Sequence, residues 1–232
     1  MERLLCSRRE GNFLIISSSE FKHLKVLRLK KGERLEVYCE GRLFLAYLSE
    51  VLKDYAICSI LEEVEKPPPK PSVVLYQCLP LDLKLMEEVV DRVSQAGAVR
   101  LVPLICRRGF RKRTGVEEKL ERWRRLSLVS FKQCKRPEPM EILPPISLEE
   151  FKPEEEVLLL LDNFTASLTI KDIDLKSNSY GLVVGPEGGF SQEEVEILKG
   201  RGFLPLLLKP YVYRSEMAGA VAVALIMNLA GG

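Results

Sequence analysis

The strongest chemical signal in the chain is the segment GPEGGFS, residues 185–191, which directly follows an apolar stretch. Its three glycines permit backbone conformations with positive φ and allow a ligand to approach the main chain closely. Ser191 and Glu194 fit the S-x-x-E capping box, so a helix begins there with free amides that can hold a carboxylate or hydroxyl. Neither G-K-[ST] nor G-x-G-x-x-G is present. The segment predicts a ligand-binding turn, with a tight strand-to-helix connection as the structural alternative.

A second candidate is LKPYVYRSE, residues 208–216, which also lies between a predicted strand and a predicted helix. Ser215 suits the position that caps a helix N-terminus. Arg214 and Glu216 place opposite charges beside it, where they can stabilise charge and move a proton. The alternative is a solvated charge pair at a helix end.

Counts of reactive residues exclude several kinds of site. His23 is the one histidine, so any Ser-His or Cys-His catalysis would have to use it. The six cysteines have no C-x-x-C spacing, and we predict no metal site. The N-terminus lacks an apolar signal region, and the apolar stretch 218–227 is shorter than the roughly 20 residues that span a bilayer. We therefore expect a cytoplasmic protein with buried, reduced thiols.

The elements that must position these residues divide at KPPPKP, residues 66–71, because consecutive prolines are stiff and lack backbone donors. We predict domains over 1–66 and 72–232. In the first, short β-rich stretches and one helix indicate a small barrel. The strands are expected at 13–16, 35–39, 43–48 and 55–61, and the helix at 19–29.

In the second domain, strands alternate with helices, which predicts a parallel sheet covered on both faces. Strands are expected at 73–79, 100–106, 157–161, 180–184 and 204–208, and helices at 82–96, 116–134, 192–199 and 215–229. Ligands of such sheets bind beyond the carboxyl ends of the strands, where both candidate segments fall.

Charge is segregated along the chain although the formal net charge is only +2. Residues 107–136 hold twelve Lys or Arg against three Glu, a local charge of +9. Residues 138–196 hold fourteen acids against three Lys, a local charge of −11, and the first 34 residues carry +5. Basic stretches in both domains can follow a phosphate backbone, with solvated faces as the alternative, and Phe110 offers a ring for stacking.

Three stretches together resemble the RsmE family of the SPOUT superfamily, whose members methylate N3 of a uridine in small-subunit (16S) ribosomal RNA. They are GLVVGPEGGFSQEEVEIL (181–198), LKPYVYRSEMAGAVAVAL (208–225) and HLKVLRLKKGE (23–33). The resemblance implies an α/β fold, in which a SPOUT-type parallel sheet carries a C-terminal trefoil knot. It also implies a small N-terminal PUA-like RNA-binding β-barrel, a homodimer and the cofactor S-adenosyl-L-methionine.

The resemblance also assigns roles to individual residues. The catalytic candidates are Arg214, which would stabilise the developing uracil anion, and Glu216. Glu216 or a water would accept the N3 proton, and the alternative role of Glu216 is that of a partner in the helix cap. The cofactor-binding candidates are Leu161, Gly185, Pro186, Glu187, Gly188, Gly189, Leu208, Tyr213 and Ala218. The RNA-binding candidates are His23, Arg28, Arg107, Arg111, Arg113 and Arg136.

Three other functions stay open at this point. A SPOUT methyltransferase could act on another RNA, such as transfer RNA. Lys209, Tyr211 and Tyr213 depart from the usual motif, so a non-catalytic RNA-binding homologue is a second alternative. Nucleotide binding at the glycine-rich turn is the third, and it predicts protection by ATP.

Overall fold

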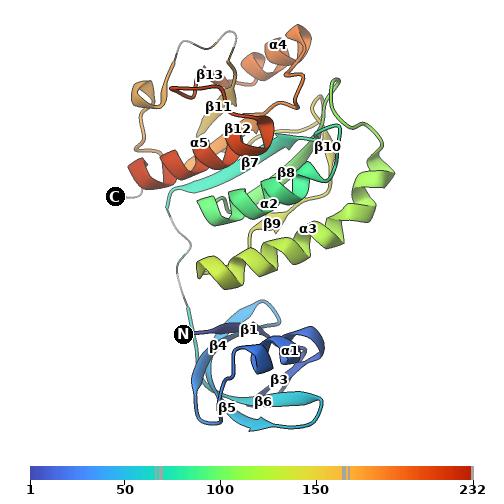
Figure 1. The fold of residues 1–232 in the computed structure, drawn as a ribbon. Coiled ribbons are helices and arrows are strands. Elements are labelled where there is room, and N and C mark those ends of the chain that lie inside the picture. Colours follow the sequence, from blue (N-terminus) through green and yellow to red (C-terminus); the bar gives the residue numbers. More distant parts are fainter. Residues whose placement is uncertain (66, 68–69, 164–165, 167, 231–232) are drawn as a thin grey trace. The chain divides into compact units, whose positions relative to one another are not determined.

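The computed structural model describes residues 1–65, 67, 70–163, 166 and 168–230. Backbone contacts divide the chain into two compact units, Met1–Pro67 and Pro68–Gly232 (Figure 1). Residues 66, 68 and 69 of the proline-rich segment lie outside the described residues.

The first unit is a curled, mostly antiparallel sheet of six strands with the order β1-β4-β5-β6-β3-β2. Apolar residues alternate along its strands, so that Leu35, Val37 and Cys39 face the core of the unit. The β4–β5 hairpin turns through Glu40 and Gly41, both with positive φ, as a tight hairpin requires. The strands are β1 (Arg3–Leu5), β2 (Arg8–Glu10), β3 (Phe13–Ser17), β4 (Arg34–Cys39), β5 (Arg42–Val51) and β6 (Tyr55–Glu63).

The sequence missed β1 and β2, because each has three residues and β2 is wholly exposed, so neither gives an apolar alternation. The helix of this unit, α1 (Ser18–Val26), ends earlier than predicted. Arg28 takes a φ of 55°, which ends the helical path without the glycine or proline that usually signals it.

The second unit is built on a seven-stranded sheet in which every described pairing is parallel. The strand order is β10-β8-β7-β12-β11-β13, and β9 pairs with β8. Its strands are β7 (Ser72–Cys78), β8 (Arg100–Ile105), β9 (Glu141–Ile142), β10 (Ile146–Ser147), β11 (Val157–Leu161), β12 (Ser179–Val184) and β13 (Leu204–Leu206). Its helices are α2 (Leu85–Ala96), α3 (Arg113–Cys134), α4 (Gln192–Gly200), α5 (Ser215–Ala230) and the short 3₁₀ helix η1 (Ile170–Asp172).

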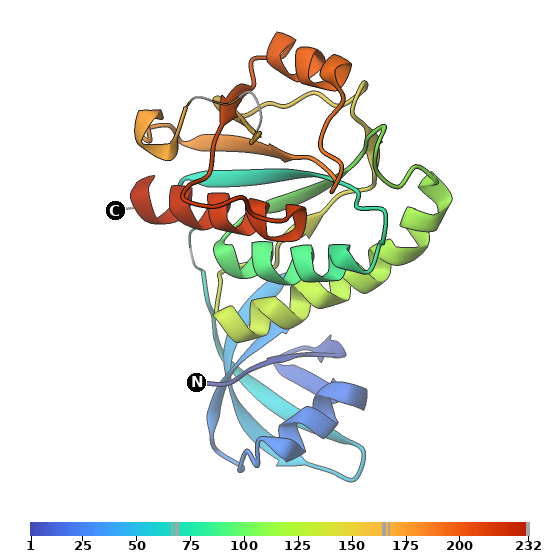
Figure 2. The same ribbon diagram turned by 45° about the horizontal axis from the view of Figure 1, so that its top comes forward.

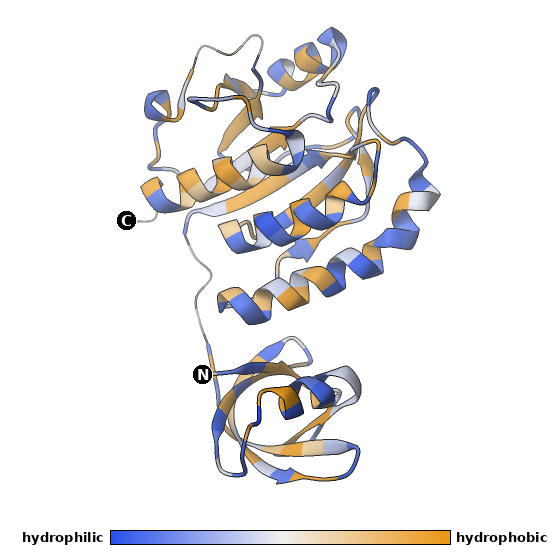
Figure 3. Cartoon of the chain, in the orientation of Figure 1, coloured by the Kyte–Doolittle hydropathy of each residue, from blue (hydrophilic) through white to orange (hydrophobic). Residues whose placement is uncertain are grey.

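Both faces of this sheet are buried, as the continuous apolar strands predict. Val73 and Leu75 of β7 belong to a core that contains α2, α3 and α5, whereas Val74 and Tyr76 face a second core with α4. Figure 2 shows α2 and α5 side by side on one face of the sheet. In Figure 3, α5 is apolar on nearly every side, which fits its burial against the sheet.

The cysteines do not follow the sequence prediction of reduced thiols. Cys6 is joined to Cys39, and Cys78 to Cys106, with Cα–Cα distances of 5.1 and 5.9 Å. Residues 28 to 33 positions apart meet here because neighbouring strands place them side by side, which cysteine spacing along the chain does not reveal.

Within the described part of the chain, no helix combines the length and apolar character needed to span a bilayer. The same described residues contain no cluster of three or more His, Cys, Asp or Glu able to hold a metal ion.

Candidate active site

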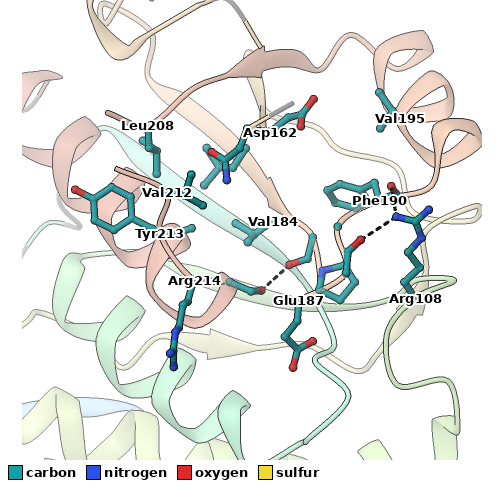
Figure 4. A pocket seen from close by; sticks show the side chains of 18 of the residues that line it. Arg108, Asp162, Val184, Glu187, Phe190, Val195, Leu208, Val212, Tyr213 and Arg214 are labelled. Atoms are coloured by element: carbon teal, nitrogen blue, oxygen red, sulfur yellow. Dashed lines mark hydrogen bonds between the residues drawn. The ribbon is translucent and has the colours of Figure 1, made fainter. Parts of the chain in front are cut away.

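A cavity of about 860 Å³ lies in the second unit at the carboxyl ends of β11, β12 and β13, beside the N-terminus of α5 (Figure 4). Its volume is within the range of small-molecule sites. The structure brings all eleven candidates for cofactor binding and catalysis to this cavity. They are Leu161, Gly185, Pro186, Glu187, Gly188, Gly189, Leu208, Tyr213, Arg214, Glu216 and Ala218.

The glycine-rich segment forms a turn between β12 and α4. The amide of Gly189, which has a φ of 66°, donates to the carbonyl of Pro186 at 2.8 Å. A Cβ atom on Gly185 would lie 3.1 Å from the ring of Phe190, so a larger residue would displace that ring. The positive φ at Gly189 and the tight contact at Gly185 both favour glycine, and glycine leaves the backbone of the turn open to the cavity.

Glu194 anchors this turn through a carboxylate that is 1% exposed. Its Oε2 accepts the Ser191 amide at 2.8 Å, and Ser191 Oγ accepts the Glu194 amide, which is the predicted capping box. Its Oε1 accepts the Arg107 amide at 2.7 Å. The start of α4 is thus tied to the loop after β8, a contact that local sequence patterns cannot show.

Two further contacts hold the turn from neighbouring loops. The guanidinium of Arg108 donates to the carbonyls of Gly188 at 2.8 Å and Phe190 at 3.3 Å (Figure 4). Glu187 accepts the Leu81 amide at 3.3 Å. Arg108 belongs to the basic stretch predicted from the sequence and lies in the loop between β8 and α3, residues 106–112, which we call the basic loop. Arg108 therefore braces the turn and lines the cavity.

The basic loop is itself fixed to the loop after β7. The Phe110 amide donates to the carbonyl of Leu79 at 3.2 Å, and the Cys78–Cys106 disulfide lies just before both loops. A Cβ atom on Gly109 would lie only 2.2 Å from the Leu79 carbonyl oxygen, so this close approach requires glycine.

The N-terminus of α5 presents the two catalytic candidates. The Arg214 carbonyl accepts the amides of Met217 and Ala218 at 2.9 and 2.8 Å, which begins the helix. The Arg214 side chain is exposed and makes no hydrogen bond or ion pair with any described residue. Glu216 is half-buried and also lines the cavity. An exposed cation and a half-buried carboxylate therefore stand at one helix end beside the cavity.

The six candidate RNA contacts have different surroundings. His23 and Arg28 are exposed in the first unit. In the second unit, Arg107 pairs with Glu193 and Arg113 pairs with Glu117, while Arg111 is exposed and has no partner among the described residues.

Arg136 has a structural role that the sequence did not predict. Its guanidinium donates to the carbonyls of Ser94 and Ala98, both at 2.6 Å, and so satisfies the C-terminal end of α2. Burial lowers the pKa of this guanidinium below its usual value. The basic run had suggested a surface residue because sequence does not distinguish an exposed arginine from one that caps a neighbouring helix.

The fold and site define a class of protein, which comparisons also identify. Residues 66–227 match the RNA methyltransferase domain family, and residues 16–61 match the RNA methyltransferase PUA domain family. The protein is thus an RNA methyltransferase with an α/β domain and a PUA-like β-domain, as predicted.

Individual relatives narrow this class. The chain is 39% identical over 220 residues to ribosomal RNA small subunit methyltransferase E of Aquifex aeolicus, covering 95% of this chain and 96% of that one. The chain belongs to the ribosomal RNA small subunit methyltransferase E (RsmE) family.

Solved structures share the fold of this chain. A putative methyltransferase from Legionella pneumophila, in complex with bound S-adenosylmethionine, is 28% identical with a TM-score of 0.84 over 97% of this chain and 96% of that one. Ribosomal RNA small subunit methyltransferase E from Neisseria gonorrhoeae has the same fold, with 24% identity and a TM-score of 0.84 over 99% and 98% of the chains.

Proposed function

We propose that this protein transfers the methyl group of S-adenosyl-L-methionine to N3 of a uridine in small-subunit ribosomal RNA. The observation that carries the proposal is the single cavity that unites the glycine-rich turn with Arg214 and Glu216. Membership of the RsmE family supports the substrate class, and the cofactor-bound Legionella relative supports the cofactor.

The cavity suits this cofactor chemically. Leu161, Val184 and Leu208 provide an apolar wall for the adenine. Asp162 and Glu196 provide carboxylates, which can accept hydrogen bonds from ribose hydroxyls and attract a positively charged sulfonium. The glycine-rich turn lines the cavity with three residues that have no side chain, Gly185, Gly188 and Gly189, so a ligand can approach their backbone groups.

Bound S-adenosylmethionine supplies an activated methyl group, so the protein has mainly to orient the attacking nitrogen and manage its proton. Glu216 accepts the N3 proton, which frees the nitrogen lone pair for the new bond to the methyl carbon, while the bond from that carbon to sulfur breaks and its electron pair stays on sulfur. Arg214 stabilises the negative charge that then develops on the uracil ring. Its guanidinium is exposed and forms no ion pair with the described residues, so it can take this role without breaking such a pair.

RNA would meet exposed basic or polar side chains in each unit. Arg28 and His23 are the candidates in the first unit. In the second unit, Arg107 and Arg111 lie in the loop before α3, and Arg113 is the first residue of α3. Phosphate contacts of this kind position an RNA without reading its sequence. Because N3 is on the Watson–Crick edge, the target uridine has to be unpaired or flipped out to reach the cavity.

Other properties remain predictions. They are the trefoil knot and the homodimer, which the resemblance implies, and the domain boundaries at 66 and 72, which the proline-rich segment predicts. Sedimentation velocity tests the dimer, with a monomer at micromolar concentration as the contrary result. We place the enzyme in the cytoplasm, because its proposed substrate is a ribosomal RNA.

The activity is tested by incubating the protein with labelled S-adenosylmethionine and small subunits or naked ribosomal RNA that lack the modification. Nucleoside mass spectrometry should find 3-methyluridine. A different methylated nucleoside would overturn the proposed target atom, and transfer RNA in a parallel reaction tests the alternative substrate. Calorimetry that detects no S-adenosylmethionine binding at millimolar concentration would overturn the enzymatic function and favour a non-catalytic homologue.

Arg108 and Arg111 provide a matched pair for separating cofactor and RNA effects. Arg108→Ala should weaken S-adenosylmethionine binding by about three- to tenfold, because the turn loses two hydrogen bonds to its carbonyls. Arg111→Ala should leave that binding unchanged, weaken RNA binding and reduce its salt slope by about 1. Calorimetry and RNA titration over a salt series measure the two effects. If Arg108→Ala changed RNA binding alone, the bracing role would be wrong.

A further inference from the structure

Gln77 of β7 lies beneath the cavity and is 1% exposed. It is in register with Val184, the last residue of β12 before the glycine-rich turn. Its Nε2 donates to Ser215 Oγ at 3.0 Å and to the carbonyl of Cys78 at 3.1 Å. A buried amide on the central part of the sheet therefore reaches the first residue of α5.

Ser215 extends this connection to the turn. Its hydroxyl donates to the carbonyl of Gly185 at 2.5 Å, a contact drawn in Figure 4. A serine hydroxyl has one proton, so Ser215 Oγ must act as the acceptor for Gln77. The result is a series of two hydrogen bonds with a fixed direction: the Gln77 amide donates to the Ser215 hydroxyl, which donates to the Gly185 carbonyl.

Close packing of α5 on β7 makes this reach possible. A Cβ atom on Gly219 would lie 2.8 Å from a methyl group of Leu75 and 3.6 Å from Gln77 Oε1. Glycine at this position lets the helix approach the strand, and the N-terminal turn of the helix is brought over Gln77. Ser215 is preceded by Arg214 and followed by Glu216, so the hydroxyl fixes the backbone that carries both catalytic candidates.

The oxygen of the Gln77 side-chain amide accepts no hydrogen bond from the described residues. Gln77 Oε1 is buried and has no hydrogen-bond partner among the described residues. Burying an acceptor in this way opposes folding, whereas an apolar side chain of similar size would avoid the penalty. The need for stability alone therefore does not explain a glutamine at this position.

We propose that Gln77 is a positioning residue for methyl transfer that acts through Ser215. It holds the α5 N-terminus, with Arg214 and Glu216, in a fixed position relative to the glycine-rich turn. This inference rests on the proposed function, because the quantity it controls is the alignment of the catalytic candidates with the methyl donor. A displacement of about 1 Å between such groups is enough to lower turnover strongly.

Gln77→Leu tests the proposal, because it removes the donor and the uncompensated acceptor together. We expect kcat to fall by about 10- to 100-fold. The affinity for S-adenosylmethionine should change by less than about threefold, because the turn keeps its other braces. The melting temperature should stay the same or rise. Turnover with saturating RNA, calorimetry and thermal unfolding measure these three quantities.

Ser215 gives a second, independent set of variants. Ser215→Ala should lower kcat like Gln77→Leu, and Ser215→Thr, which keeps the hydroxyl, should restore most of it. Ser127→Ala is the matched control: this buried serine of α3 also donates to a backbone carbonyl, that of Met140 at 2.7 Å, but it lies outside the cavity lining. It should lower the melting temperature and leave kcat unchanged.

The possible failures are distinguishable. If the wild-type protein binds the cofactor but transfers no methyl group to RNA, the proposed function fails, whatever the variants do. If the wild type is active and Gln77→Leu keeps full turnover, the positioning role is wrong. If Gln77→Leu lowers the melting temperature and the turnover in parallel, and Ser215→Thr does not restore turnover, the residues are structural and the proposal is overturned.

Discussion

Arg214→Ala should lower kcat by about 100- to 1,000-fold, the usual cost of removing a group that stabilises charge in the transition state. The affinity for S-adenosylmethionine should hardly change. The Arg214 side chain is exposed and makes no contact with the glycine-rich turn that its loss would break. Helix α5 should still begin at the same place, because only the Arg214 backbone accepts the amides of Met217 and Ala218.

Single-turnover methylation and calorimetry measure the two parameters for this variant. Arg214→Lys is the matched control, because it keeps the positive charge and loses the planar, two-pronged donor geometry. Its kcat should lie between those of the wild type and Arg214→Ala. Equal losses in turnover and cofactor affinity for Arg214→Ala would reassign the residue to cofactor binding.

Removing the Cys78–Cys106 disulfide should destabilise the second unit by about 3 to 4 kcal/mol, the chain-entropy expectation for cysteines 28 residues apart. For a unit of this size, that loss should lower the melting temperature by about 10 °C. The double variant Cys78→Ala, Cys106→Ala tests this by thermal unfolding without reductant. Alanine is suitable because both positions are buried and apolar.

Reductant provides the control for this effect. It should lower the melting temperature of the wild type towards that of the double variant. The double variant already lacks the Cys78–Cys106 bond, so the reductant has no such bond to break there. An unchanged melting temperature of the wild type in saturating reductant would contradict a stabilising role of the disulfides.

Thiol titration checks the pairing itself. The two cysteines outside the disulfides are Cys58, which is buried, and Cys134, which is exposed. Burial raises the pKa of Cys58 to about 12, so this thiol should not react in the folded protein. One thiol should therefore react in the native protein and two in denaturant without reductant. Six reactive thiols in denaturant would show that the cysteines are reduced, as the sequence alone predicted.

Local patterns predicted the elements that carry their own signal. The capping box at Ser191 and Glu194 is present, and apolar runs identified the central strands of the parallel sheet. The carboxyl-end rule for parallel sheets then correctly placed the two loop segments at one cavity. Short strands such as β9 were missed because two residues establish no periodicity.

Residues that act across the fold were harder to predict. Arg136 belongs to a basic run. It caps the end of α2 because the segment after α3 places its guanidinium beside the carbonyls of Ser94 and Ala98. Arg108 stabilises the glycine-rich turn by donating to the carbonyls of Gly188 and Phe190, which lie 80 and 82 positions away in the chain. Gln77 meets Ser215 across 138 positions. None of these distances along the chain has a periodic or motif-based signature.

The sequence by itself determined the alternation of the longer strands and helices, the segregation of charge behind a net +2, and the identities of the glycine-rich turn and the Arg214–Glu216 pair. Each follows from neighbouring residues, whose spacing sets local backbone geometry and burial. Only the tertiary structure decided which cysteines are joined, which arginines are used inside the domain and what supports the cavity. These outcomes depend on through-space contacts, because a side chain's partner is set by strand order and helix packing rather than by its neighbours in the chain.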